Sequence, residues 1–151
     1  YPPEAFVGHA RKCALAEIPL YAAMAAARDW HAVEHVAPLV HALALSYGRF
    51  NDVTGVERDL AAGANTYLIS QARGLTHGGS DNPNYIRRVL QTSPLIEDFL
   101  TAAALDLQAA LPHAAHLGMH KFPSFVADRS RRLLEMRDGY AVARLAALLA
   151  A

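Results

Sequence analysis

Three positions on one predicted helix, Asn51, Gly55 and Asp59, have the spacing of a metal-binding face. In an α-helix, residues i, i+4 and i+8 turn through only about 80° in total and rise over about 12 Å, so they share one side. An amide oxygen and a carboxylate placed this way suit Mg²⁺, which prefers oxygen ligands and keeps water and substrate phosphate in its shell. The spacing therefore indicates a cation site, to which Asp52, about 100° round the helix, contributes less naturally.

A solvated polar stripe on an amphipathic helix is the simpler interpretation of such a pair. Here, however, the polar residues interrupt a strongly apolar stretch, with Leu39 to Leu45 before them and Ala61 to Ala64 after them. Polar groups in apolar surroundings need partners. The context favours a functional site over a solvated stripe.

The nine residues Asn51 to Asp59, NDVTGVERD, resemble the second metal-binding motif of class I terpene synthases. The match is closest to the glycine-containing form of kaurene synthase-like diterpene cyclases, and the alanine-rich context is similar to bacterial ent-kaurene synthases. The resemblance implies that Asn51 and Asp59 bind Mg²⁺ directly, with a water beside Gly55 where the family usually has a hydroxyl. It also implies that Arg58 contacts the substrate diphosphate; a surface ion pair is the alternative role for this arginine.

The resemblance extends more weakly to both sides of the motif. Class I cyclases carry a diphosphate-sensing arginine near a helix break before the motif, which corresponds to Arg11 near Pro19. They also have an Arg-Tyr pair after it, which corresponds to Arg137, with Tyr140 one helical turn further on in place of the missing tyrosine.

The implied fold is the all-α helical bundle of class I terpene synthases, and the implied reaction is Mg²⁺-assisted ionisation of an isoprenoid diphosphate followed by cyclisation. The substrate would be ent-copalyl diphosphate and the product ent-kaurene, a step of gibberellin biosynthesis, or the product of a related cyclase. Because the sequence lacks a DDxxD motif and opens on Tyr1, we expect residues 1–151 to be one domain, the C-terminal portion of a cyclase, whose activity requires upstream residues.

Composition limits the other classes of protein. Fourteen basic and fourteen acidic residues cancel, so we expect no nucleic-acid partner. The apolar runs are too short for a membrane span, and a single cysteine, Cys13, fits a cytoplasmic protein. A homodimer is compatible with the sequence.

Alanine and leucine dominate, and apolar residues recur three and four positions apart, which predicts helices throughout. Pro19 should kink or break the first helical segment, and Pro94 should interrupt or bend the third. The predicted helical segments are Glu4 to Arg28, Pro38 to Arg73, Asn84 to Leu111 and Pro123 to the end, with a surface loop from Gly74 to Pro83.

Two alternatives to a cyclase remain. One is a non-catalytic helical-bundle interaction domain. The other is a histidine-based metal enzyme, because the segment His31 to His35 fits the H-x-x-E-H pattern of inverted zinc peptidases. A third zinc ligand is not evident, since His113, His116 and His120 lie between Pro112 and Lys121 around Gly118, where we expect an irregular loop.

Overall fold

The computed structural model describes residues 1–10, 16–76, 78 and 81–150, and every regular element in these ranges is helical. The prediction of an all-α protein is therefore confirmed. The helices are α1 (Pro3–Ala10), α2 (Glu17–Ala27), the short 3₁₀ helix η2 (Val33–His35), α3 (Val36–Ala61), α4 (Tyr67–Gly74), α5 (Pro83–Thr92), α6 (Leu95–Ala109), α7 (Leu111–His116) and α8 (Phe122–Leu149).

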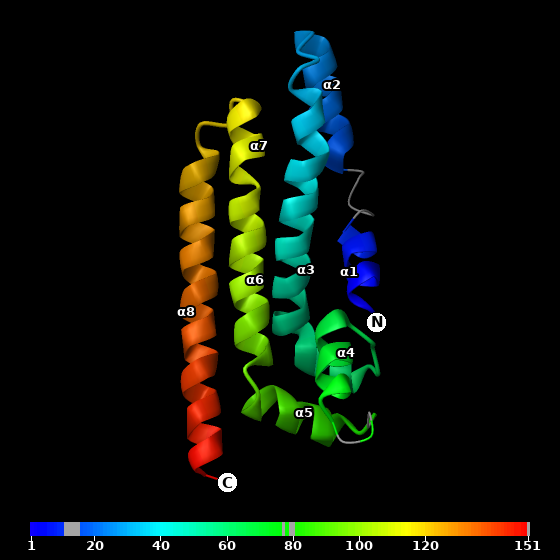
Figure 1. The fold of residues 1–151 in the computed structure, drawn as a ribbon, viewed down its shortest axis with the longest axis vertical. Coiled ribbons are helices and arrows are strands. Elements are labelled where there is room, and N and C mark those ends of the chain that lie inside the picture. The colour runs from blue at the N-terminus through cyan, green and yellow to red at the C-terminus, as the bar shows by residue number, and fades with distance from the viewer. Residues whose placement is uncertain (11–15, 77, 79–80, 151) are drawn as a thin grey trace.

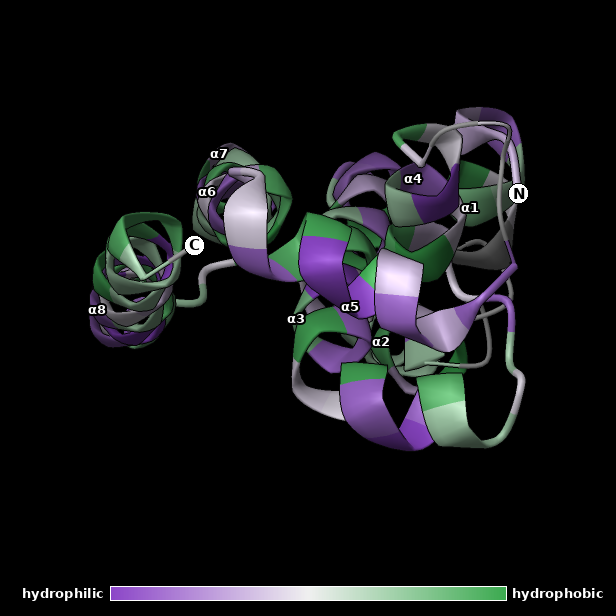
Figure 2. Cartoon of the chain, turned by 90° about the horizontal axis from the view of Figure 1, so that it is seen from below, coloured by the Kyte–Doolittle hydropathy of each residue, from purple (hydrophilic) through white to green (hydrophobic). Residues whose placement is uncertain are grey.

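Three long helices, α3, α6 and α8, stand side by side in a row with α6 in the middle (Figure 1). Viewed from below, α8 lies on one side of α6 and α3 on the other (Figure 2). The helices α1, α2 and α4 pack against α3, while α5 crosses the lower end of the row and contacts α8. Because α6 contacts both neighbours, it carries much of the buried apolar surface, including Leu100, Ala103 and Leu107.

The core divides into two clusters along the long axis. The larger cluster joins α3 to α4, α5, α6 and α8 through residues such as Val53, Leu68 and Leu100. The smaller cluster joins the first half of α3 to α6, α7 and the start of α8 through Leu39, Leu107 and other residues. The motif Asn51 to Asp59 lies on the part of α3 that builds the larger cluster.

The predicted single helix from Pro38 to Arg73 is wrong, because the structure has two helices there. Helix α3 ends at Ala61, and Gly63 follows with φ of +66°, in the left-handed region that ends helices. Thr66 then caps α4, its side chain accepting a hydrogen bond from the Ile69 backbone N–H. The chain reverses here, which brings α4 back against α3.

The predicted break at Pro19 is also wrong. Pro19 is the third residue of α2, in the first helical turn, where a backbone N–H has no intrahelical partner and its loss costs little. Helix α1 ends at Ala10, before residues 11–15, which the structure does not describe.

Other sequence predictions hold. The chain between α4 and α5 carries the expected loop as far as it is described, and Asn82 caps α5 by accepting a hydrogen bond from Asn84 N–H. Pro94 separates α5 from α6, as predicted. The expectation of an irregular loop around Pro112 is wrong in part, because His113 and His116 belong to helix α7.

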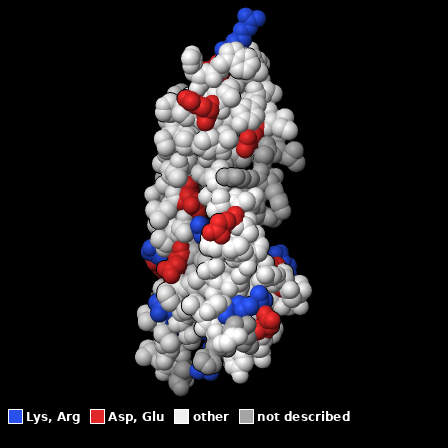
Figure 3. All heavy atoms as spheres, turned by 45° about the vertical axis from the view of Figure 1, so that its right-hand side comes forward, with Lys and Arg blue, Asp and Glu red and all other residues white. Residues whose placement is uncertain are grey.

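The surface carries scattered charge. On the face shown in Figure 3, charged side chains form small groups between uncharged ones, and several groups contain both acidic and basic side chains. Among the described residues, no helix has the length and apolar character needed to cross a bilayer.

Candidate functional site

The nine motif residues divide between two sides of α3. Val53 and Val56 are buried in the larger core cluster. Asn51 and Arg58 are exposed, and Asp59 is half-buried. The helical period therefore fixes the motif in space, with apolar side chains directed at α4 and α6 and the predicted ligands on the outer side.

Gly55 is covered by the side chain of Arg58. The guanidinium lies across the glycine and pairs with Asp59, with its Nε and Nη2 atoms each 3.0 Å from Oδ1. A Cβ atom at position 55 would stand only 2.5 Å from Arg58 Nη2 and 3.0 Å from Asp59 Oδ2. The glycine thus gives the arginine room to lie flat on the helix, in the space where a water was predicted.

Asp52 has a structural partner on the other side of the motif. Its Oδ2 accepts a hydrogen bond of 3.0 Å from the backbone N–H of Leu68, in the first turn of α4. An N–H in a first turn lacks an intrahelical acceptor, and a carboxylate there also meets the positive end of the helix dipole. Asp52 therefore ties α4 to α3, which agrees with its weaker claim as a metal ligand.

The chemistry of Asn51 and Asp59 fits a hard cation. Both offer oxygen donors, both stand on the outer side of α3, and Asp59 already holds a positive group in the form of Arg58. Within the described residues, no group of three or more His, Cys, Asp or Glu side chains is placed to hold a metal ion. A cation bound here would therefore take further ligands from water and substrate phosphate, as Mg²⁺ commonly does.

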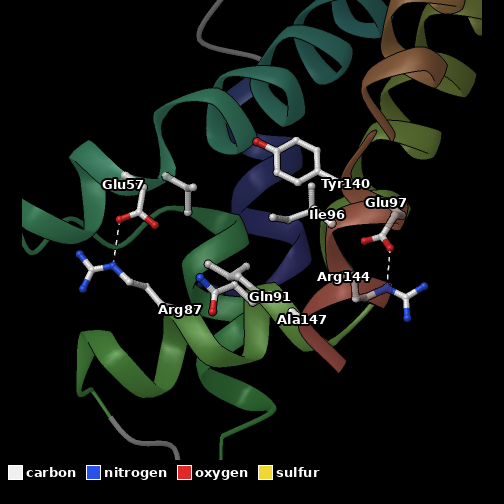
Figure 4. A pocket seen from close by; sticks show the side chains of 11 residues that line it. Glu57, Arg87, Gln91, Ile96, Glu97, Tyr140, Arg144 and Ala147 are labelled. Carbon is white, nitrogen blue, oxygen red and sulfur yellow. Dashed lines mark hydrogen bonds and ion pairs between the residues drawn. The ribbon is translucent and has the colours of Figure 1, made fainter. Parts of the chain in front are cut away.

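A pocket of about 430 Å³ lies next to the motif, between α3, α5, α6 and α8 (Figure 4). Two ion pairs stand at its edges, Arg87 with Glu57 at 2.9 Å and Arg144 with Glu97 at 2.6 Å. The remaining lining is largely apolar. The residues that line the pocket are Val56, Glu57, Arg87, Leu90, Gln91, Ile96, Glu97, Tyr140, Ala143, Arg144 and Ala147.

The other predicted site residues reach this region unequally. Tyr140 lines the pocket, and its ring lies near Ile96 (Figure 4). Arg137 does not line it, and its guanidinium is held by its neighbour Asp138, with Nε and Nη2 at 2.8 and 2.6 Å from Oδ1. Arg11 lies outside the described residues.

The sequence analysis missed Arg129 as a neighbour of the motif. This α8 residue places its guanidinium carbon 4.4 Å from the ring centre of Phe50 and 5.6 Å from that of Tyr47, both just before Asn51 on α3. Such contacts are cation–π interactions, and they set a cation beside the motif. No local pattern marks Arg129, because its contact with Phe50 spans most of the chain.

The large rings that could shape a pocket have different surroundings. Phe6 and Phe122 are buried, whereas Trp30 is exposed. Tyr140 belongs to the lining of the pocket beside the motif.

Arg49 lies two positions before Asn51 on α3 and pairs with Asp106 of α6 at 2.8 Å.

The chain matches no protein-family model, no curated protein and no solved structure. The resemblance to class I terpene synthases therefore depends on the sequence motif alone.

Proposed function

We propose that this chain is the part of a class I terpene synthase that carries the second metal motif and acts on an isoprenoid diphosphate with Mg²⁺. The observation that carries the proposal is the arrangement of four motif residues on the outer side of α3. Asn51 and Asp59 supply oxygen donors, Gly55 leaves space, and Arg58 lies in that space against Asp59. A solvated stripe does not need a glycine at position 55, where a side chain would displace the arginine.

In the proposed function Asn51 and Asp59 hold the cation, which neutralises the charge of the diphosphate leaving group when bound. Arg58 has a separate role. Its side chain is 78% exposed while that of Asp59 is 16% exposed, so the guanidinium is free to turn outward. It would exchange the Asp59 carboxylate for the diphosphate, to which it donates charge-assisted hydrogen bonds. The exchange frees the carboxylate for the cation.

The finer proposal concerns substrate and product. We propose ent-copalyl diphosphate and ent-kaurene, on the strength of the glycine-containing motif. This sequence has no aspartate-rich motif, so a second set of metal ligands would have to come from outside these residues. On α8, Arg129 and Tyr140 are the groups placed to act across from the motif, the first over Phe50 and the second in the pocket.

The test is whether the protein encoded by the whole gene forms a diterpene. Incubated with ent-copalyl diphosphate and Mg²⁺, it should release a diterpene hydrocarbon that gas chromatography with mass spectrometry detects. Asn51→Ala should abolish the product, since it removes a proposed ligand. Thr54→Ala is the matched control, because Thr54 is exposed on the same helix and its hydroxyl bonds only to the Phe50 and Asn51 carbonyls. Equal activity of the two variants would contradict the proposal.

One observation favours the second candidate, a helical interaction domain. The last turns of α8 expose Val142, Leu145 and Leu149, with 69%, 54% and 90% of their surface accessible. Apolar side chains gathered on a helix end are typical of a surface that binds a partner, including a second copy of the chain. If the partner is a second copy, sedimentation should give the mass of a dimer for the unaltered chain and that of a monomer for Leu145→Asp. A monomeric mass for the unaltered chain would exclude the homodimer.

A further inference from the structure

Three histidines meet at the end of the molecule opposite the motif. His35 ends η2, and His113 and His116 stand on α7, at the upper end of the row in Figure 1. The Nδ1 atoms of His35 and His113 face each other at 3.3 Å. The ring of His116 stacks on that of His35 with 4.0 Å between centres. Seventy-eight positions separate His35 from His113 in the sequence, so the fold alone creates the pair.

The separation of the two Nδ1 atoms suits two ligands of one metal ion. Two nitrogens each about 2.0–2.1 Å from a tetrahedral zinc ion lie about 3.3–3.4 Å apart. A hydrogen bond from a ring N–H usually spans about 2.7–3.2 Å, so 3.3 Å is long for one. Neutral imidazole is a good ligand for Zn²⁺, Ni²⁺ and Cu²⁺, and each ring offers a lone pair on Nδ1 when it carries its proton on Nε2.

Neighbouring groups hold two of the rings. Glu34 Oε1 lies 3.8 Å from His35 Nε2, which is beyond hydrogen-bond distance but places a carboxylate near the ring nitrogen that does not face His113. His116 donates from Nδ1 to the Pro112 carbonyl at 2.7 Å, which fixes the ring that stacks on His35. His35 itself is only 19% exposed, so its orientation is set by packing.

We propose that His35 and His113 form a two-histidine site for a transition-metal ion of the Zn²⁺, Ni²⁺ or Cu²⁺ class, with water completing the shell. Neither histidine-rich segment forms it alone, since each contributes one ligand. The ion joins η2 to α7 and so connects the start of α3 to the turn between α6 and α8. This site does not depend on the proposed cyclase function, because Mg²⁺ prefers oxygen ligands and the two sites lie at opposite ends of the molecule.

The experiment is a calorimetric titration of tag-free, EDTA-treated protein with Zn²⁺, together with thermal unfolding with and without the ion. One Zn²⁺ should bind per chain and raise the melting temperature, because a ligand that binds the folded state alone stabilises it. His35→Gln and His113→Gln should each weaken binding by about tenfold or more and remove the thermal shift. The double variant should weaken binding little beyond either single variant, since the two ligands act as one unit.

His120→Gln is the matched control, because His120 is exposed and follows α7 on the same end of the molecule. It should bind Zn²⁺ as the unaltered chain does. Circular dichroism of each variant without metal shows whether it is folded. The proposal is overturned if the unaltered chain binds no Zn²⁺, or if His120→Gln lowers the affinity as much as His35→Gln and His113→Gln do.

Discussion

The two sides of α3 around the motif differ in the contacts that their residues make. On the inner side, Val53, Val56 and Leu60 are buried against other helices. On the outer side, Asn51 is exposed, and Arg58 and Asp59 contact each other. The inner residues have roles that the fold explains, whereas the outer residues have none that stability requires.

This difference bears on function. Exposed polar residues contribute little to folding, so the exposed Asn51 and Arg58 are not a requirement of this helix. A glycine in the middle of a helix even costs about 1 kcal/mol relative to alanine. The outer side is therefore where a binding function is to be sought, and substitutions can separate it from the inner side.

The largest effect is expected on the inner side. Leu60→Ala should lower the free energy of unfolding by about 2–5 kcal/mol, because Leu60 is 6% exposed and its removal leaves a cavity among α3, α4 and α6. Urea denaturation measures this value. A loss below about 0.5 kcal/mol would show that the two sides do not differ as described.

A smaller effect is expected at Asp52, whose carboxylate joins α3 to α4. Asp52→Ala removes the acceptor of the Leu68 N–H in the first turn of α4 and should cost about 1 kcal/mol. Asp52→Asn keeps an acceptor oxygen and should cost less. The same denaturation experiment compares the two variants, and an equal loss for both would assign the effect to charge and not to the hydrogen bond.

Gly55→Ala sharpens the comparison because stability and binding should respond in opposite directions. Alanine raises helix propensity by about 1 kcal/mol, and the exposed Arg58 side chain can move out of the way. The unfolding free energy should stay level or rise by up to about that amount. Affinity for Mg²⁺ with diphosphate should fall, since the added methyl group fills the space beside Gly55 in which a metal-bound water is expected. A fall of more than about 1 kcal/mol in the free energy of unfolding would contradict this account of the glycine.

The sequence allowed the helical class to be predicted, together with the break at Pro94 and the loop after Gly74. The effect of a proline depends on its position within a helix. Pro19 does not break α2 as predicted, because it lies in the first turn of that helix. The sequence did not predict the turn after Ala61, because the alanines around Gly63 favour a continuous helix, whereas Gly63 is the left-handed residue that follows α3.

For the candidate site, the helical period was enough to place Asn51, Gly55, Arg58 and Asp59 together. Contacts between distant segments could not be read from local spacing. Arg129 beside Phe50 and His35 beside His113 both depend on how α3 packs with α6, α7 and α8. Arg137 shows the reverse case, since a matching separation from Asn51 did not bring it into the pocket.

The most direct test of the central claim is binding of inorganic diphosphate to the product of the whole gene, measured by calorimetry with and without Mg²⁺. We predict binding that requires Mg²⁺ and is lost in Asn51→Ala and in Asp59→Ala, while Asn51→Ala changes the free energy of unfolding by less than about 0.5 kcal/mol. Thr54→Ala should bind like the unaltered protein. Absence of Mg²⁺-dependent binding, or unchanged binding in Asn51→Ala and Asp59→Ala, would contradict the assignment of this motif to a metal-dependent terpene synthase.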